Sequence, residues 1–141
     1  MPDKDILVEK ITQIQRCFKR IKDSSGLNPA SLDDFDRQDI FVLNLQRAVQ
    51  AAIDIAVHIV NDKGWGVAKA LKENFTILEE NKVISKELAV KLKKMVGFRN
   101  LAVHDYSELN VDILKNILTN SLVDLEKFYT IISEKYISQA D

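Results

Sequence analysis

The side chains best suited to chemistry in this sequence lie in one stretch, residues 99–106, which reads RNLAVHDY. It sets an arginine, an asparagine, a histidine and a tyrosine at fixed spacing: Arg99, Asn100, His104 and Tyr106. On ordinary residue usage, this combination arises by chance in about one such chain in ten thousand. Histidine can accept or donate a proton near neutral pH, and arginine offers a permanent charge with a forked set of donors. The stretch therefore indicates phosphate-ester chemistry on a nucleic acid.

The composition limits the reactions that this stretch could catalyse. One cysteine, Cys17, and two histidines far apart in the sequence make a metal site unexpected. Without a metal, the natural internal nucleophile for a phosphodiester is a ribose 2′-hydroxyl, which RNA has and DNA lacks. We expect metal-independent cleavage of RNA that leaves a 2′,3′-cyclic phosphate and a 5′-hydroxyl, with no cofactor.

The net charge of −1 gives no general basic field, so RNA binding would need a local basic patch. A basic run just before the motif supplies candidate phosphate contacts: Lys91, Lys93 and Lys94. The first predicted helix carries a second cluster: Arg16, Lys19, Arg20 and Lys22. Both clusters are also compatible with ordinary solvated helix faces.

Length and composition predict one all-α domain over residues 1–141. Hydrophobic residues make up 46% of the chain, with four glycines and two prolines, too few for the many tight turns of an all-β fold. No apolar run approaches the roughly 18 to 20 residues of a membrane span, and no secretory signal is recognisable. The single cysteine suits a reducing compartment, so we expect a cytoplasmic protein without membrane contact.

Hydrophobic periodicity predicts four main helices and one shorter helix. They cover about 4–23, 39–61, 67–81, a segment that follows an N-cap at Ser85 and ends near the motif, and about 111–136 after a cap at Asn110. The short connections favour an antiparallel four-helix bundle with an extra short helix.

A polar stripe crosses the second helix, which is the most apolar and is expected to be central. It contains Asn44, Arg47, Ala51, Asp54 and His58, all on one helical face. The stripe could face solvent, or it could form a polar seam in a cleft or subunit interface, with Asn44, Arg47 and Asp54 as candidates. We expect His58 to be structural and Cys17 to be a small buried hydrophobe, while Trp65 anchors its loop or contacts a partner.

The motif spacing sets a geometric problem. On a continuous helix, Arg99 and His104 would lie about 140° apart and about 7.5 Å along the axis. Either the helix ends before His104, or two copies of the motif meet in a symmetric dimer. We favour the dimeric cleft.

The pattern Arg99-Asn100-x3-His104-x-Tyr106, at the end of the penultimate main helix, resembles the HEPN superfamily. More narrowly, it resembles the HepT-type toxins of HEPN/MNT toxin–antitoxin systems. Residues 39–45 (DIFVLNL) and 92–100 (LKKMVGFRN) also read like that family. The resemblance covers nearly the whole chain, apart from the acidic loop at 31–36 and the C-terminal tail.

This resemblance implies a toxic ribonuclease that acts as a homodimer with a composite cleft. Arg99 and His104 would be the catalytic pair, and Asn100 a supporting polar residue. It also implies a nucleotidyltransferase antitoxin that transfers AMP onto Tyr106, where bulk and negative charge would keep RNA out of the cleft.

Two other functions remain open from the residues. The chain could be a non-catalytic helical module that binds a nucleotide or a partner helix. It could also be the regulated half of a nucleotidyltransferase complex, with Tyr106 as a substrate and no activity of its own.

Overall fold

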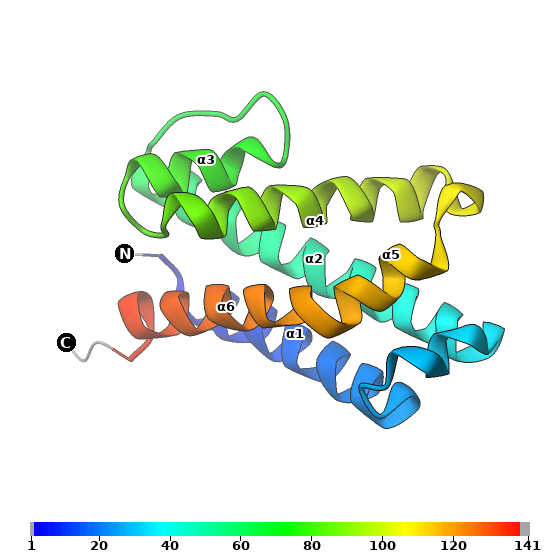
Figure 1. The fold of residues 1–141 in the computed structure, drawn as a ribbon. Coiled ribbons are helices and arrows are strands. Elements are labelled where there is room, and N and C mark those ends of the chain that lie inside the picture. The colour runs from blue at the N-terminus through cyan, green and yellow to red at the C-terminus, as the bar shows by residue number, and fades with distance from the viewer. Residues whose placement is uncertain (1, 139–141) are drawn as a thin grey trace.

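The computed structural model describes residues 2–138, and helices account for every regular element in that range. The four long helices are α1 (Lys4–Ser25), α2 (Phe35–Lys63), α4 (Lys86–His104) and α6 (Leu122–Tyr136). Two shorter helices are α3 (Glu73–Glu80) and α5 (Val111–Asn116). Two 3-10 turns, η1 (Pro29–Asp33) and η2 (Tyr106–Glu108), and the π turn η3 (Ile117–Ser121) complete the chain (Figure 1). The expected all-α bundle is confirmed.

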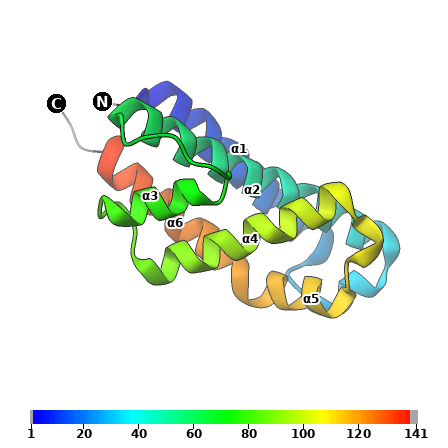
Figure 2. The same cartoon turned by 90° about the horizontal axis from the view of Figure 1, so that it is seen from above.

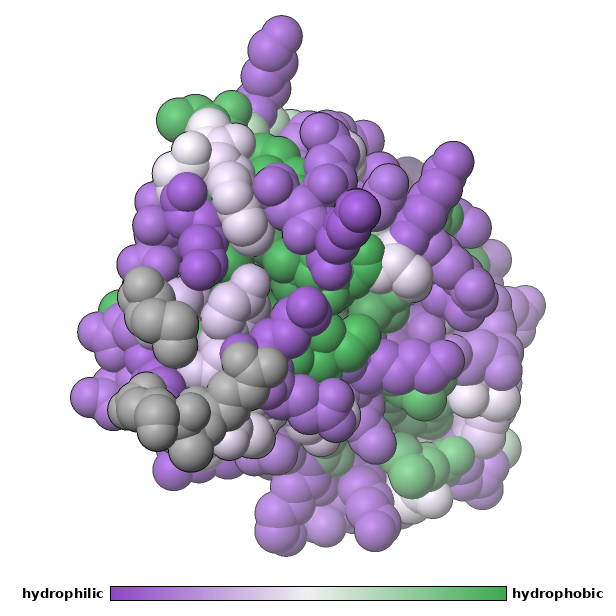
Figure 3. Space-filling view, turned by 90° about the vertical axis from the view of Figure 1, so that its left-hand side faces the viewer, coloured by the Kyte–Doolittle hydropathy of each residue, from purple (hydrophilic) through white to green (hydrophobic). Residues whose placement is uncertain are grey.

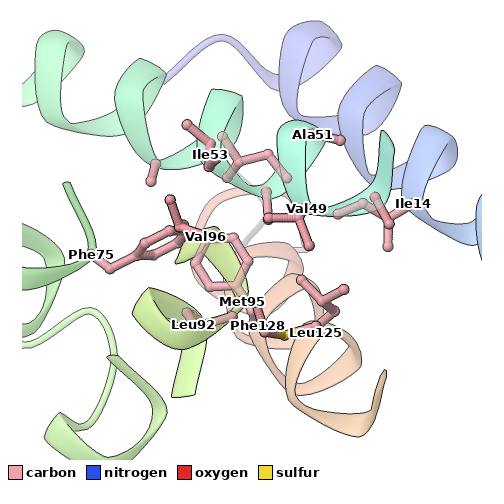
Figure 4. Packing of buried hydrophobic residues seen from close by; sticks show 14 of the residues in the cluster. Ile14, Val49, Ala51, Ile53, Phe75, Leu92, Met95, Val96, Leu125 and Phe128 are labelled. Atoms are coloured by element: carbon pink, nitrogen blue, oxygen red, sulfur yellow. The ribbon is translucent and has the colours of Figure 1, made fainter. Parts of the chain in front are cut away.

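Helix α2 is the centre of the bundle, since it packs against α1, α3, α4 and α6 (Figures 1 and 2). Its buried side chains meet those of the surrounding helices in one continuous core (Figure 4). Between α3 and α6, the rings of Phe75 and Phe128 meet edge-on with centroids 5.5 Å apart. This core fixes the direction of α4, the helix that carries the motif.

The apolar character of α2 exceeds what the sequence analysis expected. By length and composition, α2 is the one helix in residues 2–138 that could cross a membrane. In the fold, 61% of its most apolar 18-residue window is buried inside the bundle. Packing against four helices accounts for this hydrophobicity.

The helix caps explain where two helices begin. The Ser85 hydroxyl accepts a hydrogen bond from the Leu88 amide at 3.1 Å, and the Asn110 side chain accepts one from the Asp112 amide at 2.7 Å. Both predicted N-caps are therefore confirmed.

Three predicted boundaries were wrong. Helix α2 starts at Phe35 rather than near residue 39, because Asp34 caps it by accepting from the Arg37 amide at 3.3 Å. The third helix covers Glu73–Glu80 rather than 67–81: it begins without a side-chain cap, and Val67 is 92% exposed. The expected helix over 111–136 is divided by η3 into α5 and α6.

Both ends of the described chain lie at one end of the bundle, and the motif lies at the other (Figure 1). The end with the termini is mostly hydrophilic, with smaller hydrophobic areas between the polar side chains (Figure 3). The candidate chemistry is therefore confined to the end where α4 meets η2 and the start of α2.

Candidate active site at the end of α4

Arg99 lies on the side of α4 that faces the core, close to the end of the bundle. Leu92 and Met95, seven and four residues earlier, are buried on that side. Arg99 itself is half-buried; its Nε is enclosed without a hydrogen-bond partner, and its Nη1 donates to Asn100 Oδ1 at 2.8 Å. The Nε end of the guanidinium is thus enclosed by the protein. The group still has N–H donors that are not used within the protein and could bind an anion.

His104 is the last residue of α4, and its side chain is exposed. The helix is regular up to this point, because the next amide, that of Asp105, donates to the Leu101 carbonyl at 2.8 Å. The alternative in which the helix ends before His104 is therefore wrong. Within one protomer, Arg99 and His104 leave α4 about 140° apart, as for any helical pair five residues apart.

Asn100 shares the exposed face of α4 with His104, one turn away. Its side-chain oxygen is taken by Arg99, so the structure ties Asn100 to the guanidinium rather than to the imidazole. Gly97 lies on the same face, and apart from its chain neighbours and the backbone of α4 itself, no atom comes within 4 Å of the position that a Cβ would occupy there. The face around His104 is therefore open to a substrate or to a second copy of the chain.

Tyr106 begins η2 and is bound to α2. Its hydroxyl donates a hydrogen bond to Asp39, which is 67 residues away in the sequence. Partial burial, then the hydrogen bond to Asp39 and the charge of Asp39, raise the pKa of Tyr106 to about 12. The side chain is still 45% exposed and borders a shallow hollow with Asp39, Val42, Leu43 and Gln46.

Asp39, the partner of Tyr106, is a candidate site residue that the sequence analysis missed. It was quoted as the start of a family-like stretch, but it was given no role. The one sequence signal was its place near the start of the central helix, and three neighbouring aspartates share that signal: Asp33, Asp34 and Asp36.

The three candidate lysines of α4 differ in their surroundings. Lys91 lies 3.2 Å from a Glu87 carboxylate oxygen and 3.9 Å from one of Asp124, while Lys93 donates to the Thr76 hydroxyl at 3.0 Å. Lys94 is exposed and forms no ion pair within residues 2–138. Lys94 is thus available to bind a phosphate, whereas Lys91 and Lys93 contact side chains of the same chain.

Most of the polar stripe on α2 faces α1 of the same protomer. Asp54 pairs with Lys10 at 3.1 Å, and His58 Nε2 accepts a hydrogen bond from the Asp3 amide at 2.9 Å. Asn44 is buried, and Arg47 is exposed beside α1. His58 therefore has the structural role expected of it.

The other two residues singled out from the sequence have packing roles. Cys17 is buried, as expected, and burial raises the pKa of its thiol. Trp65 packs against the core from its loop. Within residues 2–138, no three His, Cys, Asp or Glu side chains gather as a metal site would require.

Residues 10–132 match the family described as "Ribonuclease HepT-like", which covers the whole motif and most of the bundle. The chain belongs to the HepT-like ribonuclease family. The predicted family resemblance is thereby confirmed.

Two relatives and one solved structure are similar to this HepT-like chain over most of its length. It is 44% identical over 128 residues to the mRNA nuclease HepT of Shewanella oneidensis, covering 91% of this chain and 96% of that protein. It is 36% identical over 109 residues to the tRNA nuclease HepT of Aphanizomenon flos-aquae, covering 74% and 72% of the two chains. It also superimposes with a TM-score of 0.88 and 42% identity on the tri-AMPylated HEPN toxin of Shewanella oneidensis in complex with MNT antitoxin. That match covers 94% of this chain and 100% of the toxin.

Proposed function

We propose that this chain is the toxin of a toxin–antitoxin pair and acts as a metal-independent endoribonuclease in the cytoplasm. One observation carries the proposal: a HepT-like chain presents a guanidinium, an amide and an open imidazole at the end of one helix, as Arg99, Asn100 and His104. Both named relatives are RNA nucleases, one for mRNA and one for tRNA. We infer RNA as the substrate class without choosing between these targets, and one domain over residues 1–141.

The reaction follows from the properties of the two side chains. His104 accepts the proton of the ribose 2′-hydroxyl while that oxygen attacks the adjacent phosphorus. The bond from phosphorus to the 5′ oxygen then breaks, and the 5′ oxygen takes up a proton from an imidazolium. Arg99, with Asn100 bound to it, stabilises the charge that gathers on the phosphoryl oxygens. The products are a 2′,3′-cyclic phosphate and a 5′-hydroxyl.

A homodimer completes the cleft. Arg99 and His104 diverge within one protomer, so one motif presents its cation and its imidazole to different sides of α4. A two-fold axis beside the open Gly97 face would bring two motifs together and would supply a second imidazole to protonate the leaving oxygen.

The antitoxin partner would be a nucleotidyltransferase of the MNT type. The matching Shewanella structure is described as a tri-AMPylated toxin with MNT antitoxin. In this chain we assign Tyr106 as the acceptor: its oxygen would attack the α-phosphorus of ATP, lose its proton and release pyrophosphate. A nucleotide on Tyr106, two residues after His104, would add bulk and negative charge at the site.

The proposal is tested by inducing the wild-type chain and His104→Ala in a bacterial host. We expect growth arrest and fragmented RNA with the wild type, and neither with the variant. The matched control is His58→Ala, because it removes the other histidine, which lies in the bundle and away from the motif. Arrest by all three proteins, or by none of them when all are folded and expressed, would refute the catalytic assignment.

Cleavage by the purified wild-type protein in the presence of EDTA tests the metal-independent chemistry. A cyclic-phosphate product is expected. A need for added divalent cations would overturn this part of the proposal.

A further inference from the structure

A hollow lies between α1 and α2, outside the motif. Six residues line it: Gln13, Arg16, Cys17, Arg20, Asn44 and Arg47. We call it the arginine hollow. Its three arginines are exposed, and within residues 2–138 none of them forms an ion pair with a carboxylate. Guanidinium groups gathered without counter-ions repel one another, so an anion bound among them is stabilised.

The carboxylates nearest along these helices are mostly engaged elsewhere. Asp54 pairs with Lys10 at 3.1 Å, and Asp23 pairs with Lys19 at 2.8 Å. Asp23, Asp34 and Asp36 border the next hollow along α2, which Arg20 also borders, but within residues 2–138 none of them forms an ion pair with Arg20. The positive charge of the arginine hollow is therefore not neutralised at short range.

The charges of Arg20 and Arg47 both act on the thiol of Cys17, which lies at the base of the hollow. Each of them favours the thiolate, although burial is the larger effect and raises the pKa of the thiol overall. Arg20 belongs to α1 and Arg47 to α2, so the two guanidinium groups approach the hollow from its two walls. This arrangement suits a phosphate held between the helices.

Asn44 provides an independent sign of a ligand. The residue is 3% exposed, and its amide nitrogen donates to the Ile40 carbonyl at 2.8 Å. Its side-chain oxygen is buried without a hydrogen-bond partner, which is unfavourable for an acceptor in a folded protein. Because this oxygen needs a donor, a ligand with both anionic oxygens and a hydroxyl fits better than a simple anion.

A strand of RNA has both groups. Its phosphodiester oxygens accept from guanidinium donors, and its 2′-hydroxyl donates as well as accepts. The surface also leads to the motif: a neighbouring hollow shares Arg20 and Asn44 and reaches Leu43, and Leu43 borders the hollow beside Tyr106. Arg47 and Asp39 are eight residues apart on α2, or about 12 Å along its axis.

We propose that the arginine hollow binds a backbone phosphodiester of the RNA that is cut at the motif. Arg16, Arg20 and Arg47 donate to the phosphate oxygens, and the Asn44 side-chain oxygen accepts from a 2′-hydroxyl. The proposal rests on the proposed ribonuclease function and extends its substrate contacts along α2. Such contacts fix the position of the strand without reading its sequence.

The test measures binding, not cleavage. A short fluorescently labelled single-stranded RNA is titrated with full-length His104→Ala at several salt concentrations, alone and combined with Arg16→Gln, Arg20→Gln or Arg47→Gln. Each arginine change is expected to weaken binding about two- to five-fold and to lower the slope of log Kd against log salt, by at most about 0.7 because the three arginines share one phosphate. The matched control is Lys135→Gln, which removes one exposed positive charge from the last turn of α6, at the end of the bundle that holds the termini, and should change neither quantity.

The role of Asn44 is tested by comparing RNA with DNA of the same sequence. Asn44→Ala should reduce affinity for RNA and leave affinity for DNA unchanged, with folding checked by thermal denaturation. Equal losses for the two nucleic acids would overturn the 2′-hydroxyl contact.

A free mononucleotide has similar chemistry, so AMP is titrated in parallel. If the arginine changes abolish AMP binding and leave RNA affinity unchanged, the hollow is a mononucleotide site and the proposal is wrong. Unchanged affinity and slope for both ligands would also refute it. If the wild type does not cut RNA but the arginine changes still weaken RNA binding, the arginine hollow is an RNA-binding site. Only the proposed ribonuclease activity is then refuted.

Discussion

The hydroxyl of Tyr106 donates a hydrogen bond to the carboxylate of Asp39, and this contact fastens the turn after α4 to the first turns of α2. The tyrosine lies two residues after His104, so the same contact holds the segment that follows the imidazole. A reaction at the phenolic oxygen removes the proton that makes this bond. Tyr106 is therefore both an exposed nucleophile and a tether of the candidate active site.

The raised pKa of Tyr106 predicts a stability difference at alkaline pH. The pKa rises from an ordinary value near 10 to about 12 in the folded protein. The stabilisation is therefore fully present below about pH 10 and is lost as the pH rises through 12. Between these values, urea denaturation should show the free energy of unfolding falling more steeply for the wild type than for Tyr106→Phe. Tyr136, whose pKa is also raised by burial, is common to both proteins and cancels. Parallel curves would contradict this prediction.

Modification of Tyr106 should loosen η2. A phosphodiester on the oxygen cannot donate to Asp39, and it places a second negative charge beside that carboxylate. The turn is otherwise held by the amides of Glu108 and Leu109, which donate to the carbonyls of Asp105 and Tyr106, each at 3.0 Å. Hydrogen exchange followed by mass spectrometry should show faster exchange at residues 105–110 in the AMP-modified protein. Asp39→Asn, unmodified, should show part of this effect, and equal exchange in all three proteins would rule out the tether.

Tyr106→Phe separates toxicity from neutralisation. The phenol has no place in the proposed cleavage step, so the variant should still arrest growth and fragment RNA. It lacks the oxygen that would accept AMP, so a co-expressed nucleotidyltransferase antitoxin should no longer rescue growth through modification. Tyr129→Phe makes the same chemical change on α6, away from the motif, and should be rescued like the wild type. A rescued, unmodified Tyr106→Phe protein would show that neutralisation works by binding alone.

The parts predicted well from the sequence are those encoded locally. Periodic apolar residues defined the long helices, and Ser85 and Asn110 marked two helix starts. The partner of Tyr106 was missed because a contact across 67 residues leaves no local pattern. The third helix was overextended since Val67 and Leu71 continue its helical spacing, yet both are exposed and make no core contact that would hold a longer helix.

Paired variants at the motif distinguish a ribonuclease from a phosphate-binding module. His104→Gln removes the proton acceptor and should lower the cleavage rate by about 10² to 10⁴, with RNA affinity unchanged. Arg99→Ala should lower both, with a loss in rate of at least about 10². Arg99→Lys should recover affinity better than rate, because it keeps the charge and loses the forked donor geometry. Single-turnover cleavage and equilibrium binding measure the two quantities, and a fully active His104→Gln would leave only the binding function.

The lysines of α4 should divide into a structural and a binding member. Lys91 lies 3.9 Å from Asp124, whose side chain is 7% exposed, so Lys91→Gln leaves a buried carboxylate without its cation. Because Lys91 itself is 43% exposed, we expect a loss of about 1 kcal/mol in the free energy of unfolding and little change in RNA affinity. Lys94→Gln should lower the affinity for RNA and leave the free energy of unfolding nearly unchanged. Lys94 is exposed and forms no ion pair within residues 2–138. Urea denaturation and RNA titration of both variants check the assignment, and a stability loss at Lys94 without an effect on binding would contradict it.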